Sequence, residues 1–147
     1  MDFDTAVKLK IYETIAQTAQ MPNSTEVAQS LNTTSEAIEA AFERLHQKRL
    51  LVPEPGNPSR IRMAPPFSGI PTPFRVMSDE KVYYANCAWD ALGIPAALHQ
   101  DAIIETSDAH NDEEIILEVK NEHPLPEPCV IHFAVPAALW WQDIIYT

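Results

Sequence analysis

Four prolines fall within the twelve residues from Met63 to Phe74, and they constrain this chain more than any other feature. Proline has a fixed φ and no backbone N–H, so neither a helix nor a central strand is expected to continue through this segment. We therefore predict a connector over residues 64–74, with one domain on either side of the proline-rich stretch. The predicted domains are residues 1–63 and residues 64–147, the second of which includes the connector.

The connector itself reads as an extended strap rather than a flexible linker, because proline stiffens the chain. Its apolar side chains, Phe67, Ile70 and Phe74, are expected to hold it against a neighbouring surface. A proline-rich ligand for a partner domain is the alternative interpretation. We favour the packed strap.

The first domain has the apolar spacing of three helices followed by a hairpin. Pro22 ends the first helix, and Asn23 or Ser24 can cap the second. This order is typical of a winged helix-turn-helix. The expected elements are helices over residues 3–19, 24–31 and 35–49, then strands over 50–52 and 60–63 around a turn-forming loop.

The second domain mixes strands with short helices, which predicts an α+β fold with antiparallel strands. An Asp- and Asn-rich turn separates two of the strands and makes them a pair. The expected strands are residues 74–77, 82–84, 102–106, 114–119 and 129–135. The expected helical segments are residues 87–92, a turn from Pro95 to Leu98, and a closing turn over 136–141.

Charge is distributed unevenly along the chain, whose net charge is −11. Residues 63–147 carry three basic against thirteen acidic side chains, and this part would repel a phosphate backbone or an anionic lipid. Residues 1–62 are nearly balanced, with seven basic and eight acidic side chains. The third helix mixes glutamates with Arg44, Lys48 and Arg49, whereas a recognition helix is usually clearly basic. DNA is therefore not the favoured partner of the first domain.

Location follows from three simple observations. No apolar run approaches the roughly 20 residues that span a bilayer, so no membrane partner is expected. The acidic start, Met1 to Asp4, differs from the basic start of a secretory signal. Two cysteines do not make a disulfide framework. A reducing cytoplasm fits best.

Cys87 and Asp90 are the residues that most suggest chemistry. They follow a short aromatic strand, at the start of a predicted helix, where backbone N–H groups and the helix dipole favour an anion. The thiol is therefore expected to ionise easily. Residues at i and i+3 share a helix face, which places the Asp90 carboxylate near whatever the sulfur holds. The plain alternatives are an ordinary buried cysteine and a polar residue of the first helical turn.

The run from Asn86 to Leu92 resembles the organomercurial (alkylmercury) lyase family, whose members carry Cys-Ala-x-Asp-x-Leu after a tyrosine-containing strand. The order of a winged-helix-like domain, connector, hairpin, helix and further strands also resembles that family. The resemblance implies protonolysis of a carbon–mercury bond. Cys87 would be the first mercury-binding thiolate and Asp90 the proton carrier. It implies no separate cofactor, and cellular thiols would help to remove the product.

The resemblance also implies a second thiolate, after a segment like Val135-Pro136-Ala137. Its expected position falls just past Thr147, where the sequence stops. Cys129 is the only other cysteine and lies before that segment. It would bind mercury only if its strand lies next to Cys87, and otherwise it is a plain strand residue.

Two alternatives to an active lyase remain at this point. The first is a non-catalytic relative of the family that binds a soft metal or a thiol-reactive compound. The second is a winged-helix transcription regulator, with the first domain on DNA and the acidic part sensing a ligand.

Overall fold

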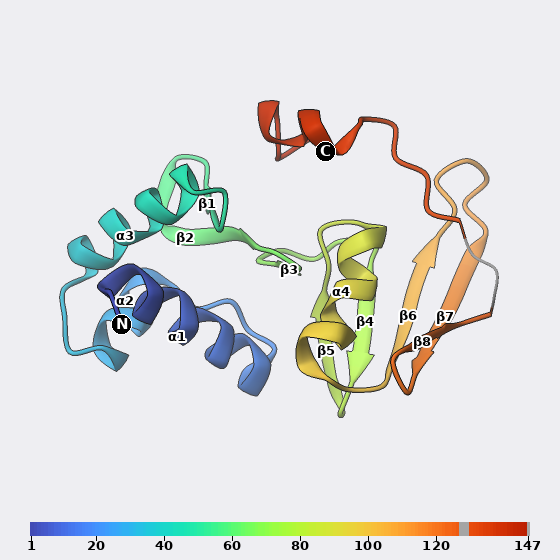
Figure 1. The fold of residues 1–147 in the computed structure, drawn as a ribbon, viewed down its shortest axis with the longest axis horizontal. Coiled ribbons are helices and arrows are strands. Elements are labelled where there is room, and N and C mark those ends of the chain that lie inside the picture. The colour runs from blue at the N-terminus through green and yellow to red at the C-terminus, as the bar shows by residue number, and fades with distance from the viewer. Residues whose placement is uncertain (127–129, 147) are drawn as a thin grey trace.

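Three helices and a three-stranded sheet form the N-terminal part of the molecule, seen at the left of Figure 1. The structure is a computed structural model that describes residues 1–126 and 130–146. The sheet is antiparallel, in the order β1-β2-β3. The elements of this part are α1 (Phe3–Thr18), α2 (Ser24–Ser30), α3 (Ser35–Gln47), β1 (Val52–Glu54), β2 (Asn57–Ala64) and β3 (Phe67–Ser68).

Side-chain caps set where the three helices begin. Asp2 accepts from the Thr5 amide at the start of α1, and Thr34 caps α3 in the same way. Asn23 and Glu26 form a reciprocal capping box on α2. These local hydrogen bonds explain why the helix starts could be predicted.

A five-stranded antiparallel sheet with one helix forms the C-terminal part, at the right of Figure 1. Its strand order is β5-β4-β6-β7-β8. Val76 and Ile104 of the central strands are buried on the face that α4 contacts. The elements are β4 (Arg75–Ser78), β5 (Lys81–Tyr84), α4 (Ala88–Leu98), β6 (Ala102–Ser107), β7 (Glu114–Lys120), β8 (His123–Leu125) and the 3₁₀ helix η1 (Ala137–Gln142). The predicted α+β fold class is confirmed.

The connector packs against both parts of the molecule. Phe67 is only 3% exposed, and its strand β3 pairs with β2, while Phe67 itself forms an isolated bridge with Ala85. A Cβ atom at Gly93 would lie 3.2 Å from Cβ of Pro66, so glycine at this position of α4 lets the connector approach closely. The connector is therefore a strap between the two sheets.

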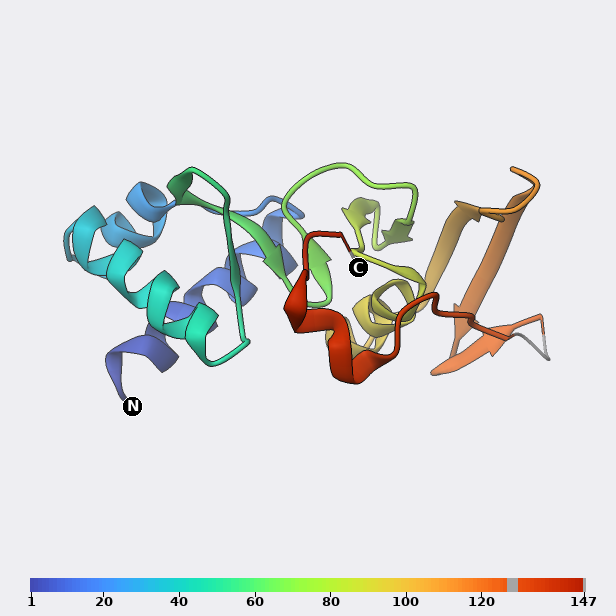
Figure 2. The ribbon, with the colours of Figure 1, turned by 90° about the horizontal axis from the view of Figure 1, so that it is seen from above.

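The buried side chains of both parts belong to one continuous core. It runs from Val7, Ile11 and Ile15 of α1 to Ile104 and Val119 of the second sheet. The Tyr83 hydroxyl of β5 also donates a hydrogen bond of 3.1 Å to the carbonyl oxygen of Ala16. The C-terminal segment, red in Figures 1 and 2, leaves the second sheet and crosses towards the helical part.

Two predicted elements of the C-terminal part are wrong. The helix does not stop at Leu92 and restart at Pro95, because α4 continues through Pro95 to Leu98. Ile94 and Pro95 are buried, and burial of this face compensates for the backbone hydrogen bond that proline cannot donate. Residues 130–135 form no strand, since β8 already pairs with β7 at that end of the sheet. The closing helical turn is present as η1.

None of the helices in the described part of the chain has the length and apolar character that crossing a membrane requires.

Candidate active site

The two predicted reactive residues lie at the start of α4, Cys87 as its N-cap and Asp90 in its first turn. Strand β5 ends at Tyr84, Ala85 bridges to Phe67, and Cys87 then becomes the N-cap of the helix with extended backbone angles. The carbonyl oxygen of Cys87 accepts the first helical hydrogen bond, from the Ala91 amide at 2.9 Å. The thiol therefore lies at the helix start, one residue before the first helical turn rather than within it.

Cys87 and Asp90 line one cavity of about 390 Å³. The helix start forms one wall and the connector and β2 form another, through Pro65 and Met63. Arg49, which follows α3, also reaches the cavity. The C-terminal segment closes the remaining side with Phe133, Trp140, Trp141, Ile144, Ile145 and Tyr146. Segments between Arg49 and Tyr146 that are far apart in the sequence thus meet around the thiol.

The expectation of an easily ionised thiol is wrong. Burial raises the pKa of Cys87 above its ordinary value. The backbone N–H of Asp90 opposes this rise, as the helix start predicted, but the Asp90 carboxylate adds to it. The Cys87 side chain makes no capping hydrogen bond. Desolvation therefore outweighs the helix terminus, and the thiol keeps its proton at neutral pH until a ligand replaces it.

Asp90 is half-buried and held by Asn86. Burial raises the pKa of the Asp90 carboxyl, and the hydrogen bond from Asn86 partly offsets this rise. That bond runs from Nδ2 of Asn86 to Oδ2 of Asp90 and is 2.9 Å long. A carboxyl group with a raised pKa beside a protonated thiol is suited to receiving and returning a proton.

Tyr12 links the helical part to this site. Its hydroxyl donates a hydrogen bond of 2.7 Å to the carbonyl oxygen of Pro65. Burial, together with the nearby Asp90 carboxylate, raises the pKa of Tyr12 to about 12. The phenol therefore stays protonated and acts as a donor that holds the connector.

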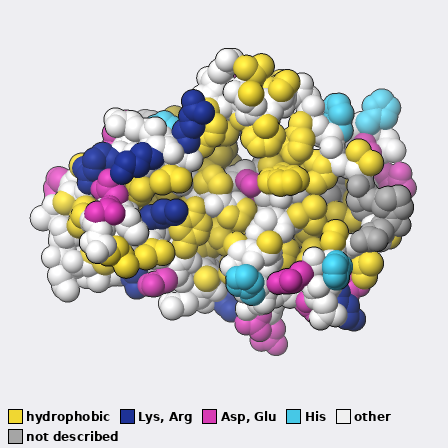
Figure 3. Space-filling model, viewed as in Figure 1, with side chains coloured by type: hydrophobic (Ala, Val, Ile, Leu, Met, Phe, Trp, Pro, Cys, Tyr) yellow, Lys and Arg dark blue, Asp and Glu magenta, His cyan; other side chains and the backbone are white. Residues whose placement is uncertain are grey.

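Aromatic side chains surround the mouth of the cavity. The rings of Phe133 and Trp140 lie 5.0 Å apart, and the Trp140 indole donates a hydrogen bond of 2.8 Å to the carbonyl oxygen of Val135. Trp89 remains 62% exposed beside the thiol, which is unusual for so large an apolar ring. Figure 3 shows hydrophobic side chains gathered across the middle of this face, between the helices and the sheet. The cavity is therefore mostly apolar around the thiol and the carboxyl group, with Arg49 and Asn86 as further polar side chains.

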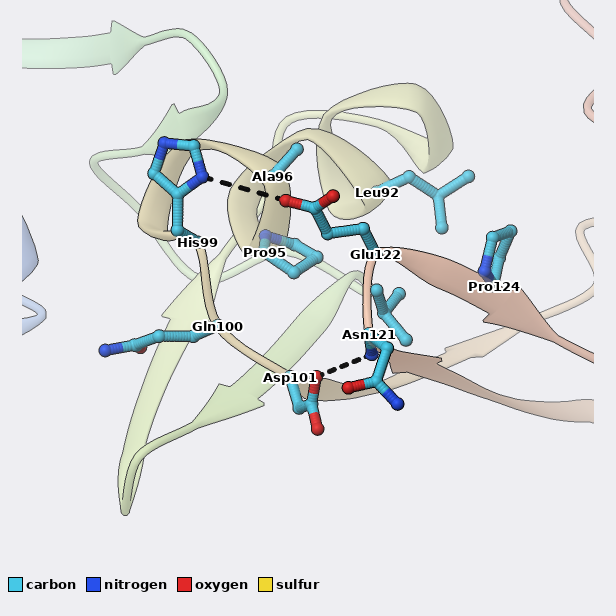
Figure 4. A pocket seen from close by; sticks show the side chains of 10 residues that line it. Leu92, Pro95, Ala96, His99, Gln100, Asp101, Asn121, Glu122 and Pro124 are labelled. Atoms are coloured by element: carbon cyan, nitrogen blue, oxygen red, sulfur yellow. Dashed lines mark hydrogen bonds and ion pairs between the residues drawn. The ribbon is translucent and has the colours of Figure 1, made fainter.

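A larger cavity, of about 640 Å³, lies at the other end of α4 (Figure 4). His99 and Glu122 approach to 3.9 Å across it, and Asp101 accepts a hydrogen bond from the Asn121 amide. Its charged side chains point to solvent, and it contains no thiol. Size alone therefore does not identify the reactive site.

Cys129, the only other cysteine of the sequence, lies outside the described residues. Within residues 1–126 and 130–146, no group of three or more His, Cys, Asp or Glu side chains is arranged to hold a metal ion. In the described part of the chain, the free thiol is that of Cys87.

The sequence did not predict that Asn86, Tyr12 and the aromatic side chains of the C-terminal segment contribute to this site. The spacing of Asn86 and Asp90, four residues apart, was a signal for their contact. Tyr12 and Trp140 gave no such signal, because their contacts with the site come from tertiary packing.

Comparisons with known proteins bear on the family and the fold of this chain. Residues 67–147 match the family model of alkylmercury lyase, and this range contains both Cys87 and Asp90. The fold is similar to that of a crystal structure described as the mercury-bound form of MerB2, with a TM-score of 0.60 and 22% identity over 78% of this chain. The chain covers 56% of that structure's length. Among curated proteins, none matches this chain significantly.

Proposed function

The chain belongs to the alkylmercury lyase family, and on that basis we propose that it cleaves organomercurials by protonolysis of the carbon–mercury bond. One observation carries the proposal. Cys87 and Asp90 line the same cavity, at the N-cap and in the first turn of one helix, within the residues that match the family. A soft mercury atom prefers sulfur, and a nearby carboxyl group can supply the proton that the leaving carbon needs.

In the first step the Cys87 sulfur binds the mercury of an organomercurial. A sulfur–mercury bond forms, and the anion opposite the organic group leaves with its electron pair. The thiol gives up its proton to the Asp90 carboxylate. Burial raises the pKa of the Asp90 carboxyl and so makes the carboxylate a better base. Burial also leaves the Cys87 thiol protonated beforehand, and formation of the sulfur–mercury bond displaces that proton.

In the second step Asp90 returns the proton to the carbon that is bound to mercury. The electron pair of the carbon–mercury bond becomes the new carbon–hydrogen bond, and the hydrocarbon leaves. Hg(II) stays on Cys87, and Asp90 is again a carboxylate. Atoms and charge balance without a cofactor or an oxidant.

Removal of Hg(II) requires a second sulfur. We propose that a small cellular thiol supplies it as a thiolate, with Cys129 as the alternative within the chain. A second small thiol then displaces the Cys87 sulfur and gives it a proton, and Hg(II) leaves bound to two small thiolates. A supply of reduced thiols fits the expected location in the cytoplasm.

The aromatic side chains that line the cavity would bind the organic group of the substrate. Trp89 from α4 and Trp140 from the C-terminal segment line the cavity that holds the thiol. Apolar rings there would bury the organic group and exclude water, which strengthens electrostatic interactions between Asp90 and the reacting carbon.

We retain the division into residues 1–63 and 64–147 as a proposal, with the first part a winged-helix-like support for the site. Two basic side chains at the end of α3 are relevant to whether this part binds DNA. Arg44 and Lys48 both pair with Asp4 of α1, at 2.7 Å and 3.3 Å. Two cations that already have an anionic partner are less available to phosphate, which argues against a DNA-binding regulator.

Mercury release from a simple organomercurial, in the presence of excess small thiol, tests the proposed function. We expect hydrocarbon and thiol-bound Hg(II) in equal amounts over many turnovers. Tight binding of mercury at Cys87 without hydrocarbon release would instead identify a non-catalytic relative that binds soft metals.

A further inference from the structure

The Asn86 side chain lies between the connector and the proposed proton carrier. Its Nδ2 atom is 2.9 Å from Oδ2 of Asp90, 3.3 Å from the Phe67 carbonyl oxygen and 3.4 Å from the Pro66 carbonyl oxygen. All three neighbours accept hydrogen bonds, so the atom that faces them must be the amide nitrogen rather than the amide oxygen. The nitrogen has two hydrogens. One points to Asp90 and the other is shared between the two carbonyl oxygens.

This arrangement makes the two oxygens of Asp90 different. Oδ2 faces an N–H donor and is therefore an acceptor. When the carboxyl group carries a proton, that proton belongs on Oδ1, because a hydrogen on Oδ2 would meet the hydrogen of Asn86. We propose that Asn86 is a positioning residue, which turns the Asp90 carboxyl so that Oδ1 delivers the proton to the mercury-bound carbon. This inference rests on the proposed function.

The connector residues that accept hydrogen bonds from Asn86 are themselves held by packing and strand pairing. Pro66 and Phe67 belong to the connector, where Phe67 is buried and β3 pairs with β2. The close approach of Pro66 to Gly93 ties the same stretch to α4. An anchor made of backbone carbonyl oxygens cannot rotate as a side chain does, so the amide plane and the carboxyl plane that follows it are both fixed.

The other end of the Asn86 amide gives an independent reason to assign it a role. Its Oδ1 atom is buried and has no hydrogen-bond partner in the described part of the chain. A buried acceptor without a partner costs free energy, and such atoms are uncommon in folded proteins. An apolar residue of the same size would avoid that cost. Asn86 is therefore better explained by what its nitrogen does than by packing.

A double-mutant cycle tests the proposal. Asn86→Leu keeps the branched shape of the side chain and removes the donor, and Asp90→Asn removes the proton carrier. We expect Asn86→Leu to lower kcat for hydrocarbon release by about 10- to 100-fold, while KM and the amount of organomercurial bound at Cys87 stay unchanged. In the Asp90→Asn background it should have no further effect, because Asn86 acts through Asp90. Asn111→Leu, in an exposed turn, is the matched control and should behave as wild type.

Two results would overturn the positioning role. One is wild-type kcat in Asn86→Leu, and the other is an equal fall in kcat with and without Asp90, which a merely structural role would produce. If the leucine variant does not fold, the same cycle with the smaller Asn86→Ser decides the question. The wild-type chain in the same assay separates the two claims. An inactive wild type removes the proposed function and this inference together, whereas an active wild type with an unaffected Asn86→Leu removes the inference alone.

Discussion

The Tyr12 hydroxyl donates a hydrogen bond of 2.7 Å to the carbonyl oxygen of Pro65, a residue 53 positions further along the chain. The next two carbonyl oxygens of the connector, those of Pro66 and Phe67, accept from Asn86. Helix α1 thus holds the segment against which Asn86, and through it Asp90, is placed. Backbone carbonyl oxygens of the connector therefore link the helical part of the molecule to the position of Asp90.

Replacing Tyr12 with Phe should therefore weaken both stability and turnover. Loss of one hydrogen bond to a partly buried carbonyl oxygen should lower the free energy of unfolding by about 0.5–1.5 kcal/mol. We expect a several-fold lower kcat as well, since the connector is less firmly held. Urea denaturation and hydrocarbon release measure the two effects.

Tyr83→Phe is the matched control for Tyr12→Phe. It removes a similar hydrogen bond, from the Tyr83 hydroxyl to the Ala16 carbonyl oxygen, that does not involve the connector. We expect a comparable loss of stability with kcat unchanged. Equal losses of kcat in both variants would contradict a specific link between Tyr12 and the site.

Replacing Cys87 with Ser should abolish mercury binding and turnover, because a hydroxyl group is a poor ligand for a soft metal. Isothermal titration with Hg(II) and the hydrocarbon assay check this. Cys129→Ser is the control at the only other cysteine and should have little effect. A loss as large as that of Cys87→Ser would instead assign Cys129 as the second sulfur.

Replacing Asp90 with Asn should separate binding from chemistry. The amide keeps the shape of the carboxyl group but cannot donate an acidic proton, so kcat should fall by about 10²- to 10⁴-fold. Binding of the organomercurial by Cys87 should persist. If binding and turnover fell together, Asp90 would be a ligand or a structural residue and not the proton carrier.

Stability should also depend on pH through Asp90. Burial raises the pKa of this carboxyl in the folded protein above its ordinary value of 3.8, so the folded state holds the proton more tightly than the unfolded state does. The resulting stabilisation is full below the unfolded pKa and is lost as pH rises through the folded pKa. Asp90→Asn removes this dependence. Its melting temperature relative to wild type should therefore rise from acidic to neutral pH, and a pH-independent difference would refute the assignment.

No binding of the wild-type chain to random-sequence duplex DNA is expected in a mobility-shift assay at low salt. Arg44 and Lys48 already pair with Asp4, and the C-terminal part of the chain is strongly acidic. Asp4→Asn leaves both cations without this partner and is the variant in which weak, salt-sensitive binding should first appear. A salt-dependent shift of the wild type would restore the regulator interpretation.

Sequence patterns predicted the elements that local interactions determine. The capped starts of α2 and α3, the hairpin of β4 and β5, and the pairing of β6 with β7 all follow from residues near one another in the chain. The prediction that Cys87 and Asp90 lie close together also rested on short spacing along the chain. In the structure both residues line one cavity.

Features that depend on distant packing were not predictable in this way. Burial of Pro95 keeps α4 continuous through a residue that locally favours a break. Strand β8 pairs with β7 at the edge of the sheet, and residues 130–135 form no strand. Desolvation by surrounding segments, including the aromatic side chains of the C-terminal segment, raises the pKa of Cys87 where the helix terminus alone would lower it.

The single core has a consequence for how this molecule loses its structure. Side chains of α1 and of the second sheet are packed in one apolar cluster, with the connector between them. Neither part can lose its packing without exposing apolar surface of the other. Heating should therefore give one sharp cooperative transition in which the helices and the cavity around Cys87 disappear at the same temperature.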